Sequence, residues 1–146
     1  MQKIMCLFVV LFLQTSLVAA DDKDQIEQFV GNWKVDVLTA NGREMPEEFR
    51  NKLRLEFTKT KMVMKMDGKD EDREMKFTLN AKASPKTITT TPLDGPFKGK
   101  PVTGIFKFEK EALILCLPNK PTDATPKEFK SEKGASMALI KLSLVK

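Results

Sequence analysis

Residues 53–66 have the sequence LRLEFTKTKMVMKM, in which apolar side chains occupy every second position along two short runs. Leu53, Leu55 and Phe57 share one side of the first run, and three methionines share one side of the second. Successive side chains of a β-strand point to opposite faces, so this period of two predicts two half-buried strands. The polar segment between them predicts an antiparallel pair.

The same period recurs in six further segments of the chain. Tight turns are predicted between neighbouring strands at Asn41-Gly42, Asp67-Gly68 and Lys110-Glu111. The further candidate strands are Trp33 to Val37, Met75 to Leu79, a wetter β-branched strand from Lys86 to Thr91, Val102 to Phe108, a doubly apolar strand from Ala112 to Leu117, and Ala138 to Val145. Eight short strands with mostly tight connections predict an all-β fold, an eight-stranded antiparallel up-and-down barrel. Such a barrel is either packed solid or holds one small ligand.

Helical and irregular segments are few. Asp24 to Val30 is expected to form one or two helical turns with Asp24 as the cap, and Pro46 to Leu53 a second short helix. Two long connections rich in Pro and Gly, 92–101 and 118–133, are expected to lie over a barrel end. One domain, residues 21–146, accounts for all of these elements.

The N-terminus has the three parts of a secretory signal. Lys3 precedes the apolar run from Ile4 to Leu13, and Val18-Ala19-Ala20 provides a small-residue cleavage site. The apolar run is about half of what a membrane-spanning helix needs, although a retained membrane anchor is the alternative interpretation. We therefore expect residues 1–20 to be a signal peptide cleaved after Ala20. The mature protein would be secreted or periplasmic, without membrane contact.

Cleavage would also remove Cys6 and leave Cys116 as the single cysteine of the mature domain. No internal disulfide could then form. Because its neighbours in ALILCL are apolar, Cys116 is expected to be buried and inert.

Composition and charge weigh against several classes of function. The formal net charge is only +5, and the charges are finely interspersed, which is not the pattern of a nucleic-acid surface. The chain has no histidine, the usual general base and metal ligand, and no tyrosine. The acidic residues from Asp67 to Asp72 match no calcium loop and are interpreted as solvated charge. We expect no catalytic activity and no cofactor.

Several motifs together resemble a known group of proteins. Gly31-Asn32-Trp33 follows a short helical segment, and the loop TPLDGPFKGK, residues 91–100, contains Asp94-Gly95-Pro96. Gly104-Ile105-Phe106, Leu113 to Cys116 and Pro126 to Ser131 follow in order. This set resembles an uncharacterised exported lipocalin-like domain family that is best represented in planctomycete bacteria, although Phe106 stands where tyrosine is more common.

The resemblance implies a lipocalin-like barrel with Trp33 packed at its closed end, under a basic residue near the last strand. Lys141 and Lys146 are both candidates for that residue. The family has no established activity, so the resemblance concerns architecture and not chemistry.

Three functions remain open at this level. The first is binding of a small apolar molecule inside the barrel. Its walls would be Met62, Met64, Met66, Met75, Phe77, Phe106, Phe108 and Leu115. The second is a protein-interaction or structural module with a filled barrel, which would act through loops such as 94–96 and 126–129. The third is soft-metal binding, because the thioethers of Met62, Met64 and Met66 could bind monovalent copper, although the same side chains also suit a core.

Overall fold

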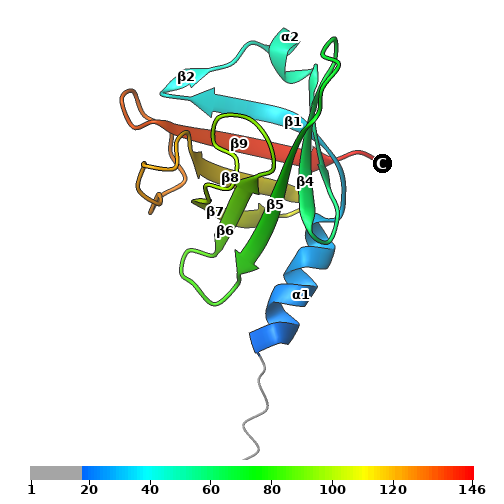
Figure 1. The fold of residues 1–146 in the computed structure, drawn as a ribbon, viewed down its shortest axis with the longest axis vertical. Helices are drawn as coiled ribbons and strands as arrows, with labels where there is room; N and C mark the ends of the chain where they lie inside the picture. Colours follow the sequence, from blue (N-terminus) through cyan, green and yellow to red (C-terminus); the bar gives the residue numbers. More distant parts are fainter. Residues whose placement is uncertain (1–17) are drawn as a thin grey trace, which may run out of the picture.

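The computed structural model describes residues 18–146, so the expected signal peptide lies almost entirely outside the described residues. β-Strands are the main regular structure of the described chain, which also has two short helices (Figure 1). In chain order the elements are α1 (Val18–Phe29), β1 (Gly31–Ala40), β2 (Arg43–Glu44), α2 (Glu47–Arg50), β3 (Leu53–Phe57), β4 (Lys61–Met66), β5 (Arg73–Asn80), β6 (Thr87–Pro92), β7 (Val102–Glu109), β8 (Ala112–Pro118) and β9 (Met137–Leu144).

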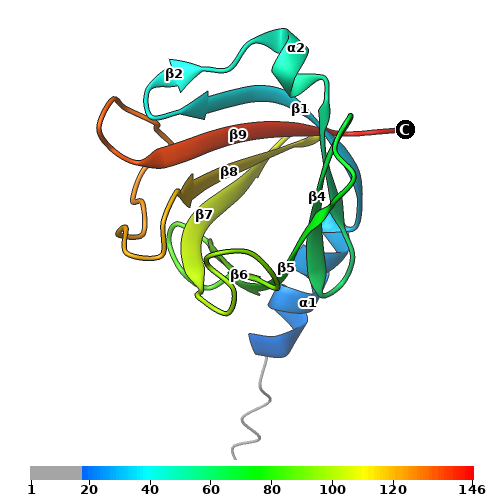
Figure 2. The same ribbon diagram turned by 45° about the horizontal axis from the view of Figure 1, so that its top comes forward.

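The strands form a closed antiparallel barrel, which confirms the predicted fold class. Each strand from β3 to β9 pairs with its sequence neighbour, and β1 closes the ring by pairing with both β3 and β9. Figure 2 shows the strands from β4 round to β9 and β1 enclosing one interior. The two-residue strand β2 is an addition to the predicted eight and pairs only with the end of β1.

Phe29, the last residue of α1, fills the end of the barrel at which α1 lies, called here the closed end. It is fully buried and its ring centroid lies 5.0–5.8 Å from those of four other phenylalanines, Phe57, Phe77, Phe106 and Phe108. Polar contacts fix the helix to the neighbouring turns, since Asp22 Oδ1 accepts a hydrogen bond from Ala81 N at 2.8 Å. The closed half of the barrel is therefore packed with aromatic side chains.

Both predicted helices differ in extent from the sequence-based expectation. Helix α1 begins at Val18, so Asp24 lies inside it and is not its cap. Alanines are strong helix formers, and Val18-Ala19-Ala20 continues the helix in the N-terminal direction. Helix α2 is only four residues long, because Leu53 belongs to β3 and pairs with Met66.

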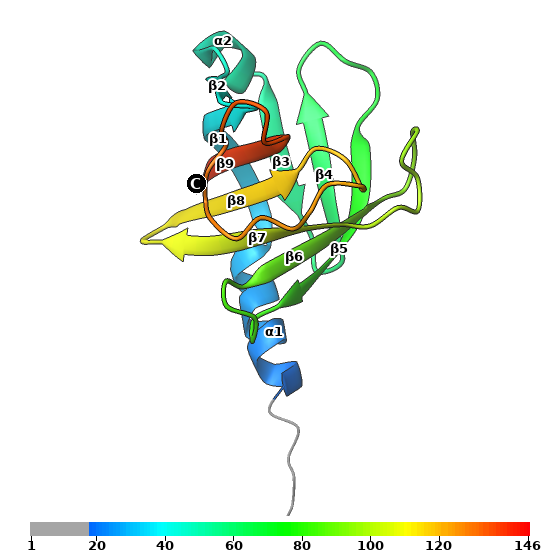
Figure 3. The same cartoon turned by 90° about the vertical axis from the view of Figure 1, so that its left-hand side faces the viewer.

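The long connection between β8 and β9 covers the outer face of the barrel, where the sequence suggested a barrel end. Figure 3 shows this loop crossing in front of β8. Ile105 and Cys116 point outward from neighbouring strands, yet both are buried. The Cys116 thiol donates a hydrogen bond to the Lys130 carbonyl at 3.4 Å. The apolar outer face of β7 and β8 therefore has its own cover.

Strand β6 is less accessible to solvent than its threonine-rich sequence suggested. Ile88 is fully buried and Thr90 is 4% exposed. Both face the interior, because side chains two apart on a strand share a face. Thr87, Thr89 and Thr91, on the opposite face of β6, are partly accessible to solvent.

Candidate functional site

A cavity of about 640 Å³ lies at the end of the barrel opposite α1, called here the mouth. It lies between the turn that joins β4 to β5 and the loop that joins β6 to β7. Its lining residues, which define the mouth cavity, are Met64, Lys69, Asp70, Glu71, Asp72, Arg73, Glu74, Met75, Pro92, Asp94, Gly95, Pro96 and Phe97.

The floor of the mouth cavity is apolar. Met64 on β4 and Met75 on β5 are partly buried and pack against the barrel core. Their strands are paired so that Met75 lies opposite Met62, which places Met64 diagonally across from Met75 on the same inward face. Pro92 and Phe97 extend this apolar surface, and Phe97 is 40% exposed.

The rim of the mouth cavity is acidic. Five carboxylates and two cationic side chains line it, although the chain as a whole has a net charge of +5. Four of the carboxylates, Asp70, Glu71, Asp72 and Asp94, are exposed. Among the lining residues, negative charges therefore outnumber positive charges by three.

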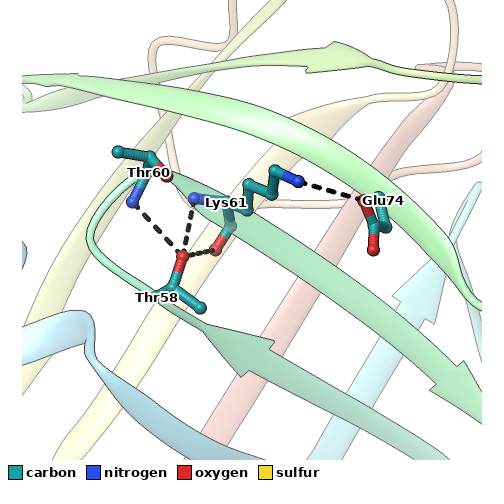
Figure 4. A network of polar contacts seen from close by, with 4 residues as sticks. All are labelled: Thr58, Thr60, Lys61 and Glu74. Atoms are coloured by element: carbon teal, nitrogen blue, oxygen red, sulfur yellow. Dashed lines mark hydrogen bonds and ion pairs between the residues drawn. The ribbon is translucent and has the colours of Figure 1, made fainter.

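The fifth carboxylate, Glu74, belongs to a polar network that stiffens the adjoining strands (Figure 4). Lys61 Nζ lies 3.4 Å from Glu74 Oε2 across the β4–β5 pair. The backbone N–H of Lys61 donates to Thr58 Oγ1 at 3.0 Å, and that of Thr60 does so at 3.4 Å. The tight β3–β4 turn therefore positions the lysine, and the lysine partly neutralises Glu74.

The eight residues predicted to line a ligand cavity separate into three groups. Met64 and Met75 line the mouth cavity. Phe108 lies at the closed end, beside Trp33. Met62, Phe77, Phe106 and Leu115 are buried in the core, and Met66 packs against it. The sequence left open whether the barrel is packed solid or holds a ligand, and aromatic packing around Phe29 fills its closed half.

The methionines do not gather at a single cavity. Met62 is 2% exposed and belongs to the core, so Met64 is the only member of the Met62, Met64, Met66 series among the mouth-lining residues. Among the described residues, no group of three or more His, Cys, Asp or Glu side chains is placed to hold a metal ion.

The residues singled out for structural roles occupy distinct places. Trp33 is 3% exposed, and its Nε1–H donates to the Phe29 carbonyl at 2.7 Å. Gly31 has φ +142°, and a Cβ there would lie 2.8 Å from Leu144 Cδ1. Asp94, Gly95 and Pro96 lie on the rim of the mouth cavity. Burial raises the pKa of the Cys116 thiol, so it stays protonated and unreactive at neutral pH.

Two groups important to the site were not identified from the sequence. Phe29 ends a helical segment just before Gly31, and its apolar character was the available signal for a plug. The acidic turn was interpreted as solvated charge, and only the fold places it beside Met64 and Met75.

Within residues 18–146, no helix has both the length and the apolar character needed to cross a membrane. No family model, curated protein or solved structure matches the chain.

Proposed function

We propose that this protein is a non-enzymatic binder of a small, mostly apolar molecule that carries a positive charge, held at the mouth of the barrel. The observation that carries the proposal is the combination, in one cavity, of a methionine floor with an acidic rim. An apolar body would displace water from the floor, and a cationic group would face the rim carboxylates.

Size and lining both support this assignment. Small-molecule sites usually have volumes of about 300–1,000 Å³, and the mouth cavity of about 640 Å³ lies within that range. Met64 and Met75 have flexible, polarizable side chains that adapt to ligands of different shape. Placement at the mouth also suits a barrel whose closed half is already filled.

Export is part of the proposal. Among the residues whose side chains are described, those that fix α1 to the barrel include Asp22, Gln25, Glu27 and Phe29, which follow the expected cleavage site. Cleavage after Ala20 would thus leave the plug of the closed end in place. Expression of the full chain with its own signal should yield a secreted product beginning at Asp21, as checked by intact mass.

The direct test compares native and denaturing mass spectra of the secreted product, purified without detergent. An extra mass present only in the native spectrum would identify a bound molecule by weight. Titration with dodecyltrimethylammonium, below its micelle concentration, would then measure affinity for a cationic amphiphile by calorimetry.

A triple variant tests the acidic rim. Asp70→Asn, Glu71→Gln and Asp72→Asn remove three rim charges, and we expect about tenfold weaker binding if each contributes about 0.5 kcal/mol at the surface. The matched control is Glu47→Gln, Glu48→Gln and Glu132→Gln, which removes the same charge from exposed residues outside the cavity. Equal loss of binding in both variants, or no binding by the parent protein, would contradict the proposal.

A second candidate function is a protein-interaction module, and one observation favours it. Phe97 lies on the mouth loop and is 40% exposed, so part of its ring is accessible to a partner. If the native mass equals the denatured mass and dodecyltrimethylammonium does not bind, Phe97→Ser should instead weaken capture of a protein partner.

A further inference from the structure

A second depression lies at the closed end of the barrel and shares no residue with the mouth cavity. Its volume is about 820 Å³. Its lining comes from α1, the start of β1, the β7–β8 turn and the end of β9 (compare Figure 1). The residues that define this Trp33 depression are Gln28, Trp33, Phe108, Glu109, Lys110, Glu111, Ala112, Lys141, Ser143, Leu144 and Lys146.

One part of the Trp33 depression is apolar, and it is accessible mainly at Leu144, because Trp33 itself is only 3% exposed. Trp33, Phe108 and Leu144 line it, and Leu144 is 41% exposed. Val145 is 49% exposed and its backbone N–H donates to the Asn32 carbonyl, which places it beside the start of β1. Val30, just before β1, is 40% exposed. Exposed apolar side chains gathered in this way are typical of a binding surface.

The other part of the Trp33 depression carries positive charge. Lys110, Lys141 and Lys146 line it, against Glu109 and Glu111. Glu109 is already engaged by Lys107 at 2.8 Å, from outside the depression.

Glu111, the other carboxylate of the depression, forms only a weak ion pair. Lys146 and Glu111 lie 3.6 Å apart, but their side chains are 81% and 86% exposed, so solvent weakens their attraction. Within the described part of the chain, Lys110 and Lys141 have no carboxylate within 4.0 Å. Lys107 is the main cause of the lowered pKa of Glu109, and the charge of Lys141 adds to it, so Lys141 lies near Glu109 without forming a close ion pair. The ammonium groups of Lys110 and Lys141 are therefore not held by any close carboxylate.

A hydroxyl group in the same wall is also without a partner. Ser143 Oγ is buried and makes no hydrogen bond to any described residue. Because this oxygen has almost no accessible surface, it contributes no contact to a molecule bound in the depression.

We propose that the Trp33 depression is a second ligand site, which takes an amphiphilic monoanion such as a fatty carboxylate. The apolar chain lies against Phe108 and Leu144, next to the nearly buried Trp33 ring, and the acidic head lies between Lys141 and Lys146. The two ends of the barrel thus select opposite charges, a cation at the mouth and an anion at the closed end. This inference stands independently of the mouth site, because no residue belongs to both.

The single tryptophan of the chain is a built-in reporter for this site. The secreted product of the full chain would be labelled with nitrogen-15. It would then be titrated with dodecanoate below the micelle concentration of dodecanoate. The Trp33 indole N–H signal and the tryptophan fluorescence would be followed. We expect one saturable transition in both signals, whereas dodecyltrimethylammonium should leave the indole signal unchanged.

Two charge-reversal variants locate the site. Lys141→Glu with Lys146→Glu should raise the Kd for dodecanoate at least tenfold. Lys98→Glu with Lys100→Glu makes the same charge change at exposed positions of the mouth loop, and should leave the Kd within twofold of the parent value. Thermal melts of both variants would verify folding.

The outcomes separate this proposal from the mouth site. An unchanged Trp33 signal up to the solubility of dodecanoate would overturn it, as would equal weakening in both variants or an equal response to the cationic probe. The Asp70, Glu71, Asp72 triple variant should bind dodecanoate normally. If that variant loses binding of dodecyltrimethylammonium but still binds dodecanoate, the result concerns the mouth site alone and supports two separate sites.

Discussion

Replacing Phe29 with alanine should remove the plug that closes the barrel. Phe29 is fully buried and contacts four aromatic rings at centroid distances of 5.0–5.8 Å. Truncation of a buried phenylalanine costs about 3–5 kcal/mol, and edge-to-face pairs contribute about 0.5–1.5 kcal/mol beyond area burial. Because these pairs are not additive, we expect a loss of about 4.5 kcal/mol in the free energy of unfolding.

The assay is a thermal melt together with urea unfolding of the parent protein and three variants. An unfolding entropy of about 2.1 cal/mol/K per residue, over the 126 residues after Ala20 (146 − 20), gives about 0.26 kcal/mol/K, so the Tm should fall by about 17 °C. Phe29→Leu keeps much of the volume and should cost about 1–2 kcal/mol. The control is Val30→Ala, at the adjacent exposed position, with an effect within about 0.5 kcal/mol. A Phe29→Ala loss below about 1 kcal/mol, or an equal loss in the control, would refute the assignment of Phe29 as the plug.

Three further substitutions test other parts of the fold. Trp33→Ala should cost about 3–5 kcal/mol, because a 3%-exposed ring and its bond to the Phe29 carbonyl are lost; an unchanged melt would contradict this. Gly104→Ala should cost about 2–3 kcal/mol in urea unfolding, since a Cβ there would overlap the Cys116 carbonyl oxygen and lie 2.5 Å from Leu117 Cδ2. Burial raises the pKa of Cys116, so the unfolded thiol ionises first and stability falls as the pH rises above about 8.5. Between pH 7.5 and 9.5 the parent protein should lose more stability than Cys116→Ala in urea unfolding, and equal losses would show that the thiol is not buried.

Alternation was a sufficient signal for the barrel because each strand has one face toward the core. Leu53, Leu55 and Phe57 illustrate this, since all three are buried while Arg54 and Glu56 are more accessible. Alternation did not predict elements that form only because they pack against other parts of the chain. Arg43 and Glu44 form a strand of two residues, which is too short to show any period.

The sequence contains a signal for the cover over β7 and β8, although it does not show which segment forms that cover. Residues 112–117 are apolar on both faces, and a strand with two apolar faces needs a partner on each side. The core supplies one partner, and the loop containing Lys130 supplies the other.

The candidate site could be predicted only in part. The sequence identified Met64 and Met75 as inward-facing residues, but it could not show that Phe29 fills the space beneath them. Nor does the order of residues along the chain show that Asp94 and the acidic turn lie on one rim. Such contacts depend on which turns share an end of the barrel, and the fold determines this.

The pairing of β1 with β9 has a consequence for the order of folding. Ala40 lies opposite Ala138, so this contact closes a loop of nearly the whole domain, and the entropy cost of closure must be met before the contact forms. A chain that emerges from the ribosome N-terminus first therefore cannot complete its barrel until β9 has been synthesised and released. Until then β1 and β8 each lack a neighbour, and the unfinished sheet has two open edges at which other chains could add. Late closure keeps the nascent chain incompletely folded for longer, and this stage is the one most in need of a chaperone.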